Sequence, residues 1–514
     1  MKERSRLQNS FFNFISGMGY RMLTLITAFV VRTVFVKCLN AEYLGINGLY
    51  SNILSMLSLA ELGFGTAMVY SMYQPLADRN SKKIQQLMKL YQKVYAIIGT
   101  VILIIGLCLV PFLDVLIKNQ PNVGGLTFYY VLFLLNSVAS YWFFAYRNAL
   151  LQADQKAYIV TNYNSLFNLI KSVLQIAFLL IFHSFTLYLV TQIICTIGQN
   201  IAVAIKVDTM YPFMKKKCDE KLPKQERNKI FRDVKALMLS KISHVALNST
   251  DNIIISAFVG LEWVGLLSNF VLISDAITSI LCQITNSITA SLGNFFAKEN
   301  KNEGYTLFCR VDFLNFWLYG FLMVALITLL NPFITIWIGE KYTLCQSAVV
   351  CLAINFFIAG FMNTLFTFRS TLGLFTQGQY RPLLVTVINI GLSIALSYRY
   401  GITGVLAATS ISRLCVNLWY DPWLIHKKGF YKSVKPYFKK WVERILLLGL
   451  ISVGMLWISN TVFKNGVSIT SFALMILFTI VLPNLVLIIV FRRTEEFQYF
   501  YNLIRKFFRA RVRN

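Results

Sequence analysis

The stretch FVKCLNAEYLGINGL (residues 35–49) has a counterpart in ISAFVGLEWVGLLSN (residues 255–269), 220 positions later. The offset aligns AEYLG with LEWVG; Glu and Gly are identical, and Trp and Val replace Tyr and Leu. Coincidence, a shared turn chemistry or a duplicated half would each explain this pair. Duplication would decide the fold, because it requires two halves with the same helices in the same order. The same register places Arg32 opposite Asn252, beside Asp251.

Composition places the chain in a membrane. Hydrophobic residues make up 56% of the 514 residues and charged residues 14%, whereas a soluble protein carries about 25% charged residues. Apolar runs of roughly 18 residues or more, which can cross a hydrocarbon core of about 30 Å, recur along the chain. We expect an all-α polytopic membrane protein of about 14 transmembrane helices. They lie near residues 11–37, 44–74, 89–117, 126–150, 158–182, 185–209, 232–259, 264–296, 305–338, 345–371, 381–399, 402–425, 442–462 and 467–491.

The net charge of +27 is concentrated in short basic blocks between the apolar runs, such as residues 215–229 and 426–440. Such blocks mark the cytoplasmic side of a membrane protein and contact anionic lipid headgroups. A nucleic-acid-binding protein would instead carry its charge in a soluble domain. We therefore predict a multi-pass protein of the cytoplasmic membrane with both termini in the cytoplasm, anionic membrane lipids as partners and no nucleic acid.

The longest polar interruption divides the first twelve predicted spans into six and six. The C-terminal sequence FQYFYNLIRKFFRARVRN (497–514) alternates aromatic and basic residues. That pattern suits an amphipathic helix on the anionic inner leaflet or a plain stop-transfer tail. The expected parts are an N-terminal bundle (1–210), a cytoplasmic linker (211–231), a C-terminal bundle (232–426), a basic loop (427–441), a helix pair (442–491) and a basic amphipathic tail (492–514).

Charged residues inside apolar spans are the candidate functional residues, because a charge at mid-membrane costs roughly 2.5–3.5 kcal/mol and usually faces a cavity or a partner. Arg21 and Arg32 are 11 residues apart, so they lie within about 20° on one helix face, about 16 Å apart. The predicted span 158–182 carries a polar stripe on one face, at i, i+4, i+7 and i+11, with a lysine inside it. The stripe consists of Asn164, Asn168, Lys171 and Gln175.

Further ionisable residues allow structural as well as functional interpretations. Arg147 is close enough to the inner surface for its side chain to reach water, whereas Arg369 lies in the predicted span 345–371. Arg32 and Lys171 would otherwise form structural ion pairs. In the span 232–259, His244, Asn248 and Asp251 share a face, and Asp275 follows in the next span; His244, Asp251 and Asp275 are candidates for ion coupling. A buried core histidine and a carboxylate that neutralises a nearby cation are the alternatives.

The sequence gives no sign of metal, disulfide or cofactor chemistry. Its nine cysteines lie mostly in apolar runs without a CxxC pair, and only three histidines are present. The cations of the first six spans outnumber the acids, which suits an anionic solute, because guanidinium and ammonium groups bind phosphate. We expect a cationic cavity lined by Arg21, Arg32, Arg147, Lys171 and Arg369 and by the polar residues Asn164, Asn168, Gln175 and Asn248.

Four segments resemble the polysaccharide-transporter branch, the Wzx-type oligosaccharide flippases, of the multidrug/oligosaccharidyl-lipid/polysaccharide (MOP) exporter superfamily. They are residues 19–67, YRNALLQADQK (146–156), NSTDNIIISAFVGLEWVGLLSN (248–269) and FRSTLGLFTQGQYRP (368–382). The resemblance covers essentially the whole chain. It implies two six-helix bundles related by a pseudo-two-fold axis, in the cytoplasmic membrane of a bacterium.

The resemblance also implies a function. Alternating access would carry an undecaprenyl-diphosphate-linked oligosaccharide from the inner to the outer leaflet, for capsule, exopolysaccharide or O-antigen synthesis. Arg21, Arg32 and Lys171 match positions where related sequences often carry basic residues, which implies contact with the diphosphate or the sugar. A polysaccharide polymerase and glycosyltransferases are the implied protein partners.

Two other function classes compete with this one. A multidrug/cation antiporter of the same superfamily would require an acidic first bundle, whereas the span 11–37 holds two arginines and no acid. A membrane enzyme would require a sizeable active-site loop or a cluster of His, Asp and Glu. The predicted outer loops are short and the histidines scattered, so we predict that the protein is not an enzyme.

Overall fold

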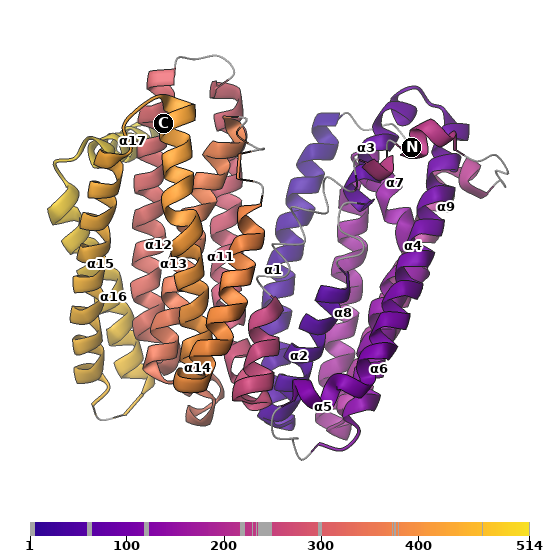
Figure 1. Cartoon of the computed structure of the whole chain (residues 1–514), viewed down its shortest axis with the longest axis horizontal. Coiled ribbons are helices and arrows are strands. Elements are labelled where there is room, and N and C mark those ends of the chain that lie inside the picture. Colours follow the sequence, from indigo (N-terminus) through magenta and orange to yellow (C-terminus); the bar gives the residue numbers. More distant parts are fainter. Residues whose placement is uncertain are drawn as a thin grey trace. The chain divides into compact units, whose positions relative to one another are not determined.

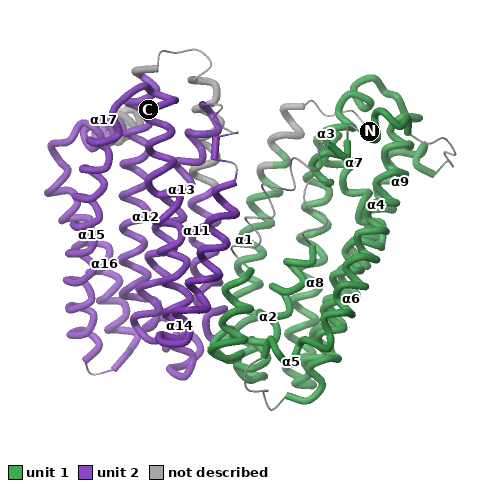
Figure 2. The backbone as a smooth tube through the Cα atoms, in the orientation of Figure 1, with its two compact units in different colours: residues 1–265 green, residues 266–514 purple. Residues whose placement is uncertain are grey.

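The computed structural model consists of long helices (Figure 1). It describes every residue except 1–5, 59–63, 118–122, 216–221, 229, 233, 235–248, 297–300, 373, 375, 376, 379, 465, 513 and 514. The chain forms two compact units, Met1–Gly265 (unit 1) and Leu266–Asn514 (unit 2), shown in Figure 2. The expected all-α membrane fold is confirmed.

Unit 1 is built around α8 (Ala157–Phe182), which packs against both α1 (Arg6–Cys38) and α9 (Phe185–Met210). α9 starts from a defined cap, since the Ser184 side chain accepts a hydrogen bond from the Leu187 amide. The remaining elements of unit 1 are α2 (Ala41–Leu57), α3 (Phe64–Ala77), α4 (Ser81–Leu109), η2 (Val110–Phe112), α5 (Leu113–Leu116), α6 (Leu126–Trp142), η3 (Ala145–Arg147), α7 (Asn148–Ala153), η4 (Pro212–Lys215) and the π-helical turn η5 (Ile255–Val259).

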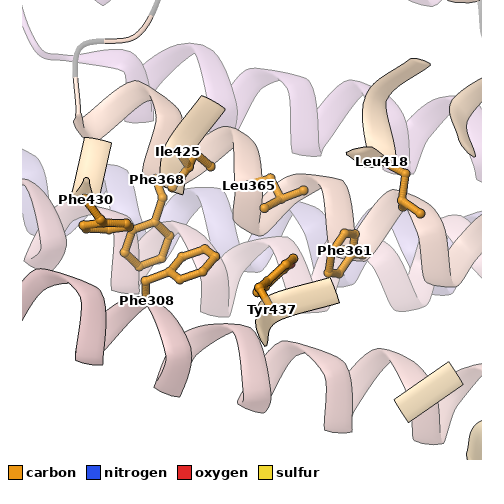
Figure 3. Close-up of a cluster of buried hydrophobic side chains, with 8 residues drawn as sticks. All are labelled: Phe308, Phe361, Leu365, Phe368, Leu418, Ile425, Phe430 and Tyr437. Atoms are coloured by element: carbon orange, nitrogen blue, oxygen red, sulfur yellow. The ribbon is translucent and has the colours of Figure 1, made fainter. Parts of the chain in front are cut away.

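Unit 2 is built around α12 (Lys301–Ile338), which packs against α13 (Gln346–Thr371), α15 (Lys435–Val462) and α16 (Ile469–Phe491). Part of its core is a cluster of buried, mostly aromatic side chains, in which Phe308 and Phe368 meet at 5.1 Å between ring centroids (Figure 3). The remaining elements are α11 (Leu261–Phe296), which begins in unit 1, η6 (Glu340–Tyr342), α14 (Arg381–Leu424), η7 (Ile425–Phe430) and α17 (Glu495–Val512).

The described helices agree in position with the predicted spans, but most of the predicted span 232–259 lies outside the described residues. Within the described residues, nine helical segments are long and apolar enough to cross a bilayer, or ten if one bent pair counts as a span. The number of 14 remains a prediction. α14 covers two predicted spans, which Gly401 separates with non-helical backbone (φ 55°, ψ −135°). The bent pair is α6 with η3 and α7, which meet at 45° after Phe144 in left-handed conformation.

The two repeated phrases contact each other inside unit 1. A Cβ atom added to Gly45 would overlap the carbonyl oxygen of Leu261, and one added to Gly265 would overlap that of Ala41. In the 220-residue register, Ala41 corresponds to Leu261 and Gly45 to Gly265, so the two contacts exchange equivalent partners. Reciprocal exchange is the contact pattern that a two-fold relation between two segments produces. Shared turn chemistry alone would not bring the two phrases together.

The predicted part boundaries remain predictions. By its contacts, the segment that ends at Gly265 belongs with unit 1, although the N-terminal bundle is predicted to end at residue 210. The glycine contacts with α2 and a hydrogen bond from the Ser256 hydroxyl to the Leu116 carbonyl at 2.7 Å join the segment to unit 1. The basic tail does form the helix α17.

Candidate substrate-binding site

The expected polar stripe of α8 lies against α1 and α9. Asn168 donates a hydrogen bond to the Thr27 hydroxyl of α1 at 3.2 Å. Asn164 accepts one from the Gln199 amide of α9 at 2.7 Å. The stripe therefore joins three helices through amide and hydroxyl groups, which satisfy one another inside an otherwise apolar bundle.

One face of α9 completes this arrangement. Tyr188, Cys195 and Gln199 follow the spacing i, i+7 and i+11, so they lie within about 40° of one another around the helix. Arg32 of α1 interacts electrostatically with Tyr188, and Lys171 of α8 with Cys195. Both cations therefore lie beside the same face of α9.

We call this arrangement the polar track. Along α8 it extends from Asn164 to Gln175, about 16 Å at 1.5 Å per residue. Lys171 is half-buried and, among the described residues, forms no ion pair with a carboxylate. The sequences of α1 and α8 contain no Asp or Glu. The members of the track are Thr27, Arg32, Asn164, Asn168, Lys171, Gln175, Tyr188, Cys195 and Gln199.

Two predicted members of the cavity occupy opposite environments. Gln175 is only 2% exposed and donates a hydrogen bond to the Tyr188 carbonyl at 3.2 Å, so it fastens α8 to α9. Arg21, 11 residues before Arg32, is exposed. The structure brings Arg32 and Lys171 to one helix face and leaves Arg21 on the open surface of α1.

Aromatic side chains surround the Arg32 end of the polar track. Tyr188 stacks on Phe185 at 5.9 Å between ring centroids and meets Phe35 edge-on at 5.2 Å. Phe185 also packs against Tyr43 and Tyr129. This packing fixes the ring of Tyr188 and with it the surroundings of Arg32, because aromatic pairs stabilise through both burial and geometry.

Arg147 occupies a structural position. Its guanidinium forms an ion pair with Asp208 near the end of α9, and the two side chains are 11% and 26% exposed. It also donates to the Tyr146 hydroxyl at 3.3 Å. The ion pair neutralises the charge that was expected to attract a substrate.

Arg369 is held in a similar way, in unit 2. It donates to the carbonyls of Leu374 at 2.8 Å and Gln377 at 2.6 Å, and its guanidinium lies 3.5 Å from Asp421. Arg381 contacts the same carboxylate at 2.6 Å. Arg369 therefore anchors the turn between α13 and α14.

Of the three candidates for ion coupling, Asp251 and Asp275 are among the described residues. His244 and Asn248 lie outside them. Asp251 belongs to unit 1, in the short helical stretch before η5, whereas Asp275 is exposed on the part of α11 that belongs to unit 2.

Sequence reasoning missed the α9 side of the polar track. Tyr188, Cys195 and Gln199 have the spacing that revealed the α8 stripe, so the signal was present. It was hidden because Tyr and Cys count as hydrophobic in a membrane span. Only the packing of α9 on α8 shows that these side chains face the cations.

Comparison with known proteins agrees with this fold. A family model described as polysaccharide biosynthesis protein matches residues 7–289, more than half of the chain. No curated protein sequence matches the chain.

Three solved structures share this fold. The lipid II flippase MurJ in an inward closed conformation has a TM-score of 0.62 at 16% identity, over 95% of this chain and 99% of MurJ. An inward-facing multidrug resistance MATE family transporter of the MOP superfamily also has a TM-score of 0.62 at 16% identity, over 81% of this chain and 99% of its own. A Vibrio cholerae MATE transporter, VcmN, has a TM-score of 0.53 at 13% identity, over 83% of this chain and 99% of VcmN.

At these identities the structures show the fold alone, whereas the sequence model covers the helices that carry the polar track. The chain belongs to the polysaccharide biosynthesis protein family and has the multi-span fold of the MOP transporters.

Proposed function

We propose that the protein is a flippase for an undecaprenyl-diphosphate-linked oligosaccharide, which it moves from the inner to the outer leaflet for the synthesis of a surface polysaccharide. The polar track is the observation that carries this proposal. Arg32 lies on α1 and Lys171 on α8, two helices without an acidic residue, and both cations lie beside one face of α9. Membership of the polysaccharide biosynthesis protein family supports it.

The chemistry of the track fits a diphosphate followed by sugars. A guanidinium donates two parallel hydrogen bonds to phosphate oxygens, and an ammonium acts as a point charge. The amides of Asn164, Asn168 and Gln199 offer the donors and acceptors that sugar hydroxyls need. The lipid tail requires no polar surface, so it can remain in the bilayer while the head moves along the track.

Alternating access would complete the transport cycle. A ligand shifts a conformational equilibrium only by its difference in affinity for the two states. The diphosphate would bind the two states with different affinity if it contacts both Arg32 and Lys171 in one state and loses one of these contacts in the other. Surface polysaccharide synthesis would then give transport its direction. Glycosyltransferases would produce the lipid-linked oligosaccharide on the inner side, and a polymerase would consume it on the outer side.

A transport experiment tests the role of the polar track. Deleting the gene should stop surface polysaccharide and accumulate lipid-linked repeat units on the inner leaflet. Lys171→Ala should fail to restore export, with a loss of about tenfold or more if one charge-assisted hydrogen bond is removed. Lys171→Arg should restore part of it. Lys37→Ala, which removes an exposed lysine at the end of α1, is the matched control.

Two outcomes would contradict the proposal. Export by Lys171→Ala and Arg32→Ala at the level of the native protein would show that the track does not bind the substrate. Unchanged surface polysaccharide with altered resistance to cationic dyes, on deletion, would favour a multidrug/cation antiporter. The fold alone allows that second function, because the MATE transporter matches with the same TM-score as MurJ.

A further inference from the structure

A cavity of about 210 Å³ lies in unit 2, where α12, α15 and α17 meet, whereas the polar track belongs to unit 1. Thr306, Lys440 and Glu495 of its lining are exposed, so it opens to the surface. It is smaller than the roughly 300–1,000 Å³ of sites for drug-sized ligands. A diphosphate with several sugars would not fit, so its ligand would have to be a different, small molecule.

Two ion pairs account for most of the charge in the cavity wall. Arg444 donates to Asp312 at 2.7 Å, and the Tyr437 hydroxyl donates to the other carboxylate oxygen at 3.3 Å. Lys440 lies 3.0 Å from Glu496. These pairs neutralise two cations and two carboxylates and hold α15 to α12 and α17.

One cation and one carboxylate of the wall remain without an opposite charge among the described residues. The Arg310 guanidinium lies 3.8 Å from the centroid of the Tyr499 ring. A guanidinium that stacks through its face keeps its N–H donors at its edge. Glu495, in the first turn of α17, is the unmatched carboxylate. The cavity therefore offers a single positive and a single negative group.

The position of the cavity along α15 also limits which ligand it could bind. α15 carries polar and charged residues up to Arg444 and then the apolar run ILLLGLISVGML (445–456). The cavity therefore lies where a membrane helix passes from the polar headgroup layer into the hydrocarbon core. Lys432, which does not line the cavity itself, lies 4.2 Å from the centroid of the Tyr305 ring, and Tyr305 forms part of the cavity wall.

We propose that this cavity binds an aminoalkyl phosphate, the zwitterionic headgroup of a phosphatidylethanolamine. The phosphate contacts Arg310 and the Thr306 hydroxyl, and the ammonium contacts Glu495. The bound lipid then links the start of α17 to α12. This site is independent of the proposed flippase activity.

Lipid binding to the purified full-length protein tests the assignment. Native mass spectrometry would compare phosphatidylethanolamine with phosphatidylcholine, whose quaternary amine has no N–H donor, and phosphatidylglycerol, which has no amine. We expect one phosphatidylethanolamine to bind about tenfold more tightly than either, the value of one charge-assisted hydrogen bond. Equal affinity for the three lipids would overturn the proposal.

Variants locate the site. Arg310→Gln should weaken binding of phosphatidylethanolamine about tenfold, and Glu495→Gln should remove its advantage over phosphatidylcholine. Neither residue belongs to the two ion pairs, so both variants should fold. Arg505→Gln on the exposed side of α17 and Glu303→Gln at the start of α12 are matched controls. A loss of affinity in the controls equal to that in the variants would overturn the assignment.

Glycerophosphoethanolamine separates the headgroup from the lipid. We expect this soluble compound to compete with the lipid, which would support the headgroup contacts. We also expect it to bind more weakly than the lipid, which would show that the ligand comes from the membrane. Failure to compete at any concentration would contradict headgroup recognition. Binding as tight as that of the lipid would show that a soluble aminoalkyl phosphate, and not the lipid, is the ligand.

Discussion

Asp312 and Arg444 form an ion pair whose side chains are 4% and 9% exposed. Breaking a buried pair by removing one partner costs about 3–5 kcal/mol, because the other charge stays buried without compensation. Asp312→Leu should therefore strongly lower the unfolding temperature of the purified protein in detergent.

The double variant Asp312→Leu/Arg444→Met measures how strongly the two side chains stabilise each other. It removes both charges, so it should be less destabilised than the sum of the single variants. Additive effects on the unfolding temperature would show that the two side chains do not stabilise each other.

At the scale of helices, the glycine contacts between the two repeated phrases admit no side chain. Gly45→Ala and Gly265→Ala should each destabilise the protein by about 1–3 kcal/mol, because the added methyl group meets a backbone carbonyl. Gly454→Ala, on a part of α15 with open space around it, is the control and should be neutral or slightly stabilising. Thermal unfolding of the three variants measures the difference. Equal effects would contradict the backbone contact.

The docking of α17 should depend on pH through Glu496. Burial favours the protonated acid, but hydrogen bonds from its own backbone amide and from Lys440 outweigh burial and hold its pKa below the usual value. A lowered pKa stabilises docking above the ordinary pKa of a glutamate, and that contribution is lost as the pH falls through the lowered value.

Hydrogen exchange of α17 measures this dependence. Protection of residues 495–505 should decrease as the pH is lowered from about 6 to about 3, after correction for the intrinsic exchange rate. Glu496→Gln should exchange faster at the higher pH and show a smaller pH effect. Protection that is the same in both proteins at every pH would contradict a role of the Lys440–Glu496 pair.

At the scale of the whole molecule, orientation in the membrane can be read from Cys345. This thiol is exposed just before α13, on the side predicted to be outside. Burial raises its pKa, but hydrogen bonds from Ser347, Thr403 and nearby backbone outweigh burial and lower it below the usual value, which favours the reactive thiolate.

An impermeant maleimide should therefore label intact cells through Cys345. Labelling should disappear in Cys345→Ser, and a cysteine placed at Lys428 should react only after the membrane is broken. Reaction of that second position in intact cells would reverse the predicted orientation.

The sequence by itself determined the class, the positions of the long helices among the described residues, and the family. In lipid, a long apolar run satisfies its backbone hydrogen bonds by forming a helix. The hydrophobic content of 56% and the positions of the apolar runs were therefore enough to predict the helices. It also identified Arg32 and Lys171, because a charge within an apolar run stands out, and the α8 stripe, because its polar members repeat at helical spacing. The resemblance to polysaccharide transporters is confirmed by the family match.

Only the tertiary structure decided which cations face a polar track and which are neutralised. Arg147 and Arg369 look like Arg32 in the sequence, but their carboxylate partners, Asp208 and Asp421, lie 61 and 52 positions away along the chain. Likewise, one glutamate and one glycine shared by two five-residue phrases did not by themselves favour duplication over coincidence. The reciprocal contacts of Gly45 and Gly265 in the structure relate the two phrases to each other. Pairing over such distances depends on how whole helices pack, which no local pattern of residues records.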